Sequence, residues 1–207
     1  MSTYILGNAQ DARIHSGSPT KNFGMSDLIA LGHKDADADF AIARSVIYFP
    51  ALHTGGVPRN RKVLSAKLEL YLMQDNCSYS RTYSFFRLKT SFVEGQVTWN
   101  NRKDGTPWET AGLWKASGTS NDYEIGVKIA TTKLAANESK GWKTWNLNVD
   151  KVFEMINGVW TNYGFFGMCD AEYNDAYMFW SQQQADTNYR PKLTVEVEDY
   201  AGGIIFM

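Results

Sequence analysis

Alternating apolar and polar positions predict that most of the chain forms β-strands. Between residues 65 and 73, one set of side chains is apolar and the other is polar or aromatic: Ala66, Leu68, Leu70 and Leu72 alternate with Lys67, Glu69 and Tyr71. A period of two places the two sets on opposite faces of a half-buried strand. Further strands are predicted at residues 4–6, 12–15, 26–32, 42–49, 83–88, 123–132, 142–147, 163–169, 176–180 and 190–198. Because 83–88 is the next strand after 65–73, we expect these two strands to pair.

One short helix is predicted from about Val149 to Asn157. Asn148 is a suitable N-cap and Gly158 a suitable left-handed C-terminal residue, and the apolar stripe consists of Val152, Met155, Ile156 and Val159. Many strands and one short helix predict an all-β fold. We expect a single domain over residues 1–199, followed by an apolar C-terminal tail over 200–207.

The segment 92–114 holds three of the seven tryptophans and breaks both helical and strand periodicity. Its Asn-Asn and Asp-Gly pairs and its proline predict a long, ordered surface connection. Aromatic rings beside amides and charged groups suit a sugar, so the candidate ligand site consists of Trp108, Arg102, Asp104 and Glu109. The alternative is that Trp99, Trp108 and Trp114 cap the ends of the hydrophobic core.

The charge pattern argues against nucleic acid as a partner. The 207 residues include 21 basic and 22 acidic side chains, with no basic block to neutralise phosphates. No run of 18 or more apolar residues is present, so no membrane partner is expected. The N-terminal residues lack the basic and apolar regions of a secretory signal, which predicts a product kept in the cytosol unless a processed form is in hand.

Two cysteines and one acidic segment are candidates for cross-linking and metal binding. Cys77 and Cys169 either form one disulfide or remain thiols, and without a sign of export we expect thiols. Asp170, Glu172 and Asp175 could hold a hard cation such as a structural calcium ion, while the alternative is a solvated turn. No other cofactor is expected.

The sequence predicts a protein without catalytic activity. None of the three histidines lies in an HExxH pattern, and neither GxSxG nor CxxC occurs. A glycoside hydrolase needs two carboxylates across a cleft, and the segment around Glu94, Asp104 and Glu109 would serve only if the fold separated two of them in that way.

Several motifs, in order, resemble the DNRLRE family of β-sandwich modules, which is related to carbohydrate-binding modules. They are Pro19–Gly24, Arg44–Phe49, Leu64–Tyr71, Val97–Asn101 with Thr106–Trp108, Ile156–Trp160, Asn162–Phe165 and Tyr189–Leu193. The resemblance implies a jelly-roll-like sandwich of two antiparallel sheets, here with one short helix, and a non-catalytic role such as polysaccharide attachment. Similar modules occur in phage structural proteins.

These features together predict a bacteriophage virion protein, a decoration subunit that would adhere to surface glycans. A virion protein is assembled in the host cytoplasm and needs no secretion signal. The apolar tail residues Ile204, Ile205, Phe206 and Met207 would contact other virion proteins or further copies of the chain. The alternatives are a tail that folds back on its own sandwich and a stand-alone extracellular polysaccharide-binding module.

Overall fold

The computed structural model describes residues 1–33, 41–75, 77–115, 118–172 and 175–199. Strands dominate the fold, as the alternating pattern predicts. They are β1 (Ser2–Leu6), β2 (Gln10–His15), β3 (Leu28–His33), β4 (Ile42–Tyr48), β5 (Val63–Asp75), β6 (Arg81–Leu88), β7 (Asn101–Lys103), β8 (Thr106–Pro107), β9 (Tyr123–Leu134), β10 (Gly141–Asn146), β11 (Phe165–Cys169), β12 (Asp175–Trp180) and β13 (Lys192–Val197). The α-helix α1 spans Val149–Asn157, and the short 3-10 helices η2 and η3 span Pro50–Leu52 and Thr187–Tyr189.

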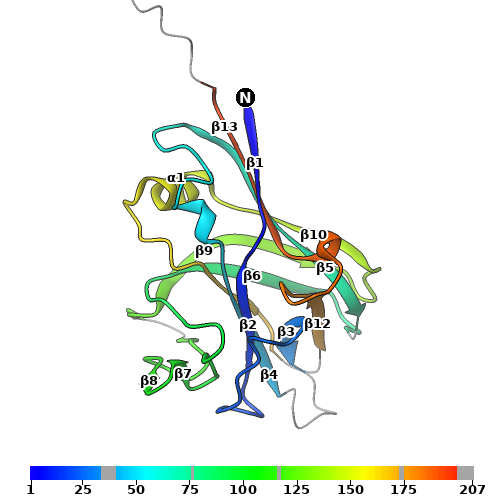
Figure 1. Cartoon of the computed structure of the whole chain (residues 1–207). Coiled ribbons are helices and arrows are strands. Elements are labelled where there is room, and N and C mark those ends of the chain that lie inside the picture. The colour runs from blue at the N-terminus through cyan, green and yellow to red at the C-terminus, as the bar shows by residue number, and fades with distance from the viewer. Residues whose placement is uncertain (34–40, 76, 116–117, 173–174, 200–207) are drawn as a thin grey trace, which may run out of the picture.

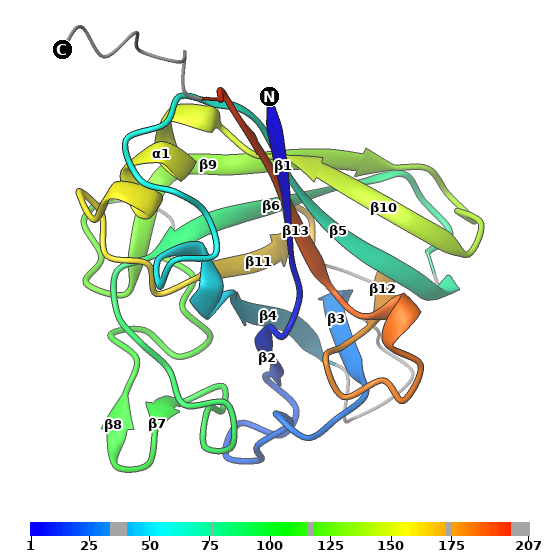
Figure 2. The same ribbon diagram turned by 45° about the horizontal axis from the view of Figure 1, so that its top comes forward.

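The main antiparallel sheet curls into two layers. Its order is β1-β13-β5-β12-β3-β4-β11-β6-β9, with β10 added beside β5 and β2 beside β4. In Figure 2, the first layer, made of β1, β13, β5 and β10, lies in front of the second layer, which contains β11, β6 and β4. Strands β3 and β4 join the layers where Gly32 pairs with Ala43. The predicted all-β, sandwich-like fold with one short α-helix in the described residues is therefore confirmed.

The expected pairing of β5 with β6 is wrong. Strand β6 pairs with β11 and β9 in the second layer, whereas β5 pairs with β13, β10 and β12. The two strands follow each other in sequence but face each other across the core. Trp145 of β10 links the layers there, since its Nε1 donates a hydrogen bond to the Tyr83 carbonyl at 3.0 Å.

The core between the layers is built from the inward residues of alternating strands. Ala66, Leu68, Leu70 and Leu72 of β5 are all buried in it, as the period of two predicts. Met155 and Ile156 of α1 close one end of this core. Burial of each such side chain contributes about 1.5–3 kcal/mol before ordering costs.

The segment 92–114, which we call the cover, buries the outer face of the second layer. In Figure 1 it lies beside β2 and β4 and contains the two-stranded sheet β7–β8. A second apolar cluster forms between cover and sheet, made of Ala12, Ile14, Val46, Phe86, Leu88, Phe92, Val97, Trp108, Leu113, Tyr123, Phe166 and Met168. Covering on both faces explains why β11 is buried at every position. The predicted surface connection is thus ordered, but much of it forms a structural layer.

Helix α1 begins and ends where the sequence predicts. The Asn148 side chain accepts a hydrogen bond from the Lys151 amide, and Gly158 adopts the left-handed conformation at φ 77°. The buried guanidinium of Arg87 in β6 fastens the helix, because it forms ion pairs with Glu154 at 2.6 Å and with Glu124 at 2.8 Å.

Both cysteines are buried thiols that form no disulfide, as expected. The Cys77 sulfur lies 3.1 Å from the Tyr83 hydroxyl. Burial raises the pKa of Cys169 to about 11, so its thiol stays protonated at neutral pH.

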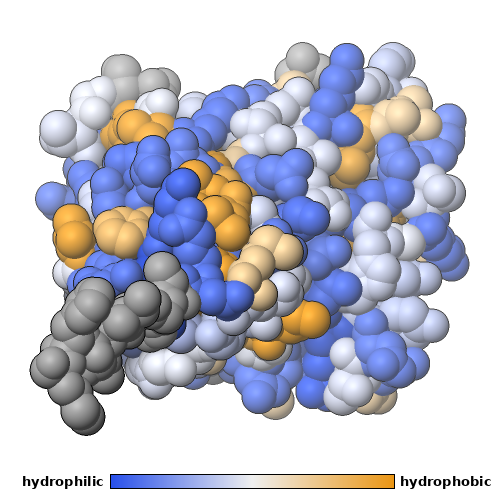
Figure 3. Space-filling model, turned by 90° about the horizontal axis from the view of Figure 1, so that it is seen from above, coloured by the Kyte–Doolittle hydropathy of each residue, from blue (hydrophilic) through white to orange (hydrophobic). Residues whose placement is uncertain are grey.

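Three further points concern membrane-spanning helices, the surface and the C-terminal tail. Among the helices of the described ranges, none is long and apolar enough to cross a membrane. On the coloured part of the face in Figure 3, hydrophobic residues form small separate groups among hydrophilic ones. The apolar tail 204–207 lies outside the described residues.

Candidate functional site

The predicted sugar-stacking role of Trp108 is not supported by its position. The ring is 3% exposed and belongs to the cluster under the cover. Its Nε1 donates a hydrogen bond to the Thr98 carbonyl at 3.1 Å. Because a sugar needs an open ring face, we assign Trp108 a structural role. The alternative, in which Trp108 caps an end of the hydrophobic core, also needs correction. Trp108 packs on the outer face of the second layer and not at an end of the main core.

The other three predicted site residues are at the surface, and each has a hydrogen-bond partner in the cover or next to it. Arg102 donates to the Ser91 carbonyl at 3.1 Å, and Asp104 lies at the exposed turn between β7 and β8. Glu109 accepts hydrogen bonds from the Asn121 amide and from Lys115. These bonds hold the pKa of Glu109 below its usual value. With Trp108 buried, the four residues do not form one ligand surface.

The candidate metal ligands Asp170 and Glu172 are engaged by cationic side chains. Lys128 contacts Asp170 at 2.5 Å, and the Arg44 guanidinium holds Glu172 through two hydrogen bonds of 2.6 and 2.7 Å. Asp175 begins β12, and its side chain lies outside the described part of the chain. No group of three or more metal-binding side chains occurs among the described residues. The calcium hypothesis therefore gains no geometric support.

The outer face of the first layer carries a cluster of aromatic side chains instead. Trp142 of β10 pairs directly with Tyr71 of β5, and their ring centroids lie 5.5 Å apart in an edge-on arrangement. Tyr189 of η3 packs against Tyr71 with a centroid distance of 4.5 Å. The Nζ of Lys192 in β13 lies 4.0 Å from the Trp142 ring centroid. Three elements thus bring aromatic and cationic groups together on one sheet face.

A groove of about 390 Å³ runs beside this cluster, and we call it the sheet-face groove. Its lining combines the Trp142 ring with amide, hydroxyl and cationic side chains and with a few residues that have no polar side chain. The full lining is Ile5, Gly7, Asn8, Trp142, Gln182, Thr187, Asn188, Arg190, Pro191 and Lys192. Arg190 is oriented by a hydrogen bond from its Nε to the Gln184 carbonyl at 2.7 Å. The Nζ of Lys192 also lies 3.8 Å from the Oε2 of Glu69. The lining of the groove therefore combines an aromatic ring with hydrogen-bonding groups, of which Arg190 is held by the protein itself.

The buried carboxyl group of Asp11 holds the loop 181–191, which lines the sheet-face groove and which we call the groove loop. Asp11 of β2 is 1% exposed and accepts a hydrogen bond from the Gln182 amide at 2.8 Å. Its own amide donates to Glu94 of the cover at 2.8 Å, and Gln183 donates to the same carboxylate. Burial raises the pKa of Asp11 to about 8, and the negative charge of Glu94 adds to this effect. Strand β2, the cover and the groove loop therefore meet at one protonated carboxyl group.

Sequence reasoning missed the sheet-face groove, although part of its signal was present. The alternation correctly places Tyr71 on the face of β5 opposite to its leucines. The structure puts Trp142 on the outward face of β10, where it pairs with Tyr71. A single exposed aromatic residue does not mark a binding surface, whereas a group of them on one sheet face does. The pairing of β5 with β10 and the position of Tyr189 depend on distant segments, so no local pattern reveals them.

The geometry defines a class of protein: a two-layered β-sandwich with a candidate ligand groove on one sheet face. Within this class, the chain belongs to the family of the Disaggregatase related repeat domain, whose model matches residues 11–195. This match overturns the resemblance to the DNRLRE family. The motifs that suggested that resemblance fall within the matched range, but the family they indicated is wrong. No curated protein matches the sequence.

Proposed function

We propose that the domain is a non-catalytic module that binds a polysaccharide in the sheet-face groove. The observation that carries the proposal is that Trp142 lines a groove together with amide, hydroxyl and cationic side chains. A sugar ring stacks its apolar face on an aromatic side chain, while its hydroxyls bond to polar groups. Asn8, Gln182 and Asn188 supply such groups.

The charge of the lining favours an acidic polysaccharide. Lys192 and Arg190 line the groove, and no aspartate or glutamate is among its described lining residues. Their positive charge would attract the carboxylate of a uronic acid. The same lack of acidic groups argues against glycoside hydrolysis, which uses two carboxylates flanking the bond that breaks.

The experiment is titration calorimetry of the purified domain with tetragalacturonate and, as a neutral probe, cellotetraose. We expect the acidic probe to bind more tightly, and its affinity to fall as salt screens the charges. Trp142→Ala should weaken binding in the groove by roughly tenfold or more. Trp114→Ala is the matched control, because Trp114 is 38% exposed and lies outside the groove. Equal affinities for wild type and Trp142→Ala would refute the proposed site.

The virion assignment remains a prediction. It rested on the resemblance now corrected and on the tail 204–207, which lies outside the described residues. Its glycan-adhesion component and the alternative of an extracellular polysaccharide-binding module both need a glycan site, and the sheet-face groove would serve either role.

A further inference from the structure

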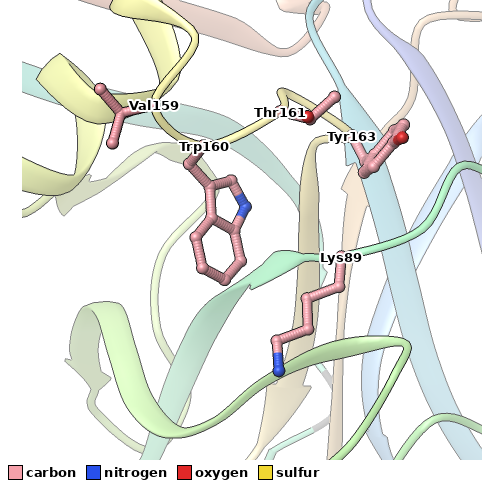
Figure 4. A pocket seen from close by; sticks show the side chains of 5 residues that line it. All are labelled: Lys89, Val159, Trp160, Thr161 and Tyr163. Carbon is pink, nitrogen blue, oxygen red and sulfur yellow. The ribbon is translucent and has the colours of Figure 1, made fainter.

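A second concave site lies away from the sheet-face groove. Two adjoining hollows, each of about 280 Å³, share Thr161 and Tyr163, and we call them together the Trp160 cavity. The lining comes from three separate segments, 48–53, 89–92 and 159–163: Tyr48, His53, Lys89, Ser91, Phe92, Val159, Trp160, Thr161, Asn162 and Tyr163. None of these residues lines the sheet-face groove. Figure 4 shows the Trp160 ring and the Lys89 side chain on either side of the opening.

The wall of this cavity is held in a fixed conformation. Asn162 is 5% exposed; its Nδ2 donates to the Phe49 carbonyl at 3.0 Å, and its Oδ1 accepts from the Gly164 amide at 3.1 Å. Gly164 has φ 90°, and a Cβ atom there would lie 2.3 Å from the Ile47 carbonyl oxygen. Only glycine fits such a position. The segment that carries Thr161 and Tyr163 is therefore fastened to the end of β4.

Trp160 is also oriented before any ligand arrives. Its Nε1 donates to the Leu88 carbonyl at 3.1 Å, and the Arg87 guanidinium lies over the ring, 3.9 Å from its centroid. Arg87 is itself fixed by Glu124 and Glu154. A preorganised aromatic wall lowers the entropic cost of binding.

The lining has the chemistry of a sugar-binding site. The rings of Trp160, Tyr163 and Tyr48 offer apolar surface, and the hydroxyls of Thr161 and Ser91 offer hydrogen bonds. In addition, the Nδ1 atom of His53 is buried without a hydrogen-bond partner in the described structure. A ligand hydroxyl would supply the hydrogen bond that this buried atom lacks.

We propose that the Trp160 cavity is a second glycan site, which takes one or two sugar residues at the end of a chain. Each hollow of the cavity has a volume of about 280 Å³. Pockets for drug-sized ligands begin at about 300 Å³, so these hollows fit one or two sugar residues. The choice of ligand class rests on the proposed function of the domain. With two sites that share no residue, one domain contacts two glycan chains and links them.

The test is calorimetric stoichiometry with tetragalacturonate and cellotetraose, using one blocking variant for each site. Thr161→Trp fills the Trp160 cavity from an exposed position, and Thr119→Trp places the same ring on the surface outside both sites. Wild type and Thr119→Trp should bind two ligands per domain, and Thr161→Trp one. Trp142→Ala should keep one ligand at wild-type affinity while binding in the groove weakens by roughly tenfold or more. The double variant Thr161→Trp with Trp142→Ala should keep only the weakened groove binding.

Each alternative result separates this inference from the proposed function. If Thr161→Trp binds as many ligands as wild type, the second site is wrong while the groove stands. If Thr161→Trp abolishes all binding and Trp142→Ala changes nothing, the groove is wrong and the Trp160 cavity is the glycan site. If wild type binds neither probe, both proposals fail.

Discussion

Leu70 occupies the middle of β5 with its side chain wholly buried between the two layers. Its neighbours along the strand alternate in burial, so a single apolar side chain every second residue is enough to define the inner face. The same rule correctly identifies the outward position of Tyr71. It fails for Trp108, because the residue type predicts an aromatic contact but does not tell whether the partner is a sugar or the protein's own sheet.

Leu70→Ala should lower the free energy of unfolding by about 2–5 kcal/mol, through lost transfer energy and the cavity left behind. Urea denaturation followed by tryptophan fluorescence measures this loss. Lys67→Ala, at an exposed position of the same strand, is the control and should change stability by no more than about 0.5 kcal/mol. A similar small effect for both variants would contradict the assigned inner face of β5.

At the scale of elements, the strands and the helix follow from local patterns, whereas their partners do not. Helix α1 has the predicted bounds because its cap, stripe and terminal glycine are all local signals. The partner of β5 could not be predicted, since sheet pairing joins segments that are distant in the chain. The cover was missed as a layer because its apolar residues have no regular spacing, and β7–β8 was missed because both strands are very short.

Two glycines in the cover provide a test of how tightly it packs. Both have positive φ, 65° at Gly105 and 72° at Gly112, but an added Cβ meets nothing at Gly105 and would lie 2.3 Å from the Trp99 ring at Gly112. Gly105→Ala should therefore cost only the conformational term of about 1–2 kcal/mol. Gly112→Ala should cost about 1–3 kcal/mol more, because Trp99 must move.

Thermal or urea unfolding of the two glycine variants gives the comparison directly. The Gly112 carbonyl also accepts a hydrogen bond from Arg44, whose guanidinium lies 4.9 Å from the Trp99 ring centroid. A shift of Trp99 should therefore change tryptophan fluorescence in Gly112→Ala but not in Gly105→Ala. Equal losses of stability in the two variants would show that the cover is not packed against the sheet as described.

At the scale of the whole molecule, the two layers, the cover and the groove loop depend on one another at Asp11. Its amide contacts Glu94 of the cover, and its carboxyl group holds Gln182 of the groove loop. The candidate groove is therefore attached to the same buried junction that positions the cover. Nothing in the local sequence around Asp11 distinguishes it from a solvated aspartate, because its burial comes from segments 83 and 171 residues away.

Asp11 should make the stability of the domain depend on pH. Its folded pKa is raised from 3.8 to about 8, with burial as the main cause. Below about pH 4 the group is protonated in both states. As pH rises from about 4 to 8, the unfolded chain ionises while the folded protein keeps its proton, so this group lowers the free energy of unfolding by up to about 1.4 kcal/mol per pH unit. Above the folded pKa both states are ionised and the loss stops.

Asp11→Asn should remove this contribution, since the amide cannot ionise and its oxygen can still accept the hydrogen bond from Gln182. Urea denaturation of wild type and variant at several pH values from 4 to 9 measures the effect. The free energy of unfolding of Asp11→Asn, minus that of wild type, should increase with pH up to about pH 8 and then remain constant. Asp104→Asn, at an exposed turn, is the control and should follow the wild-type profile. Parallel profiles for wild type and Asp11→Asn would mean that Asp11 titrates as an ordinary carboxyl group and that the junction holding the groove loop is open to water.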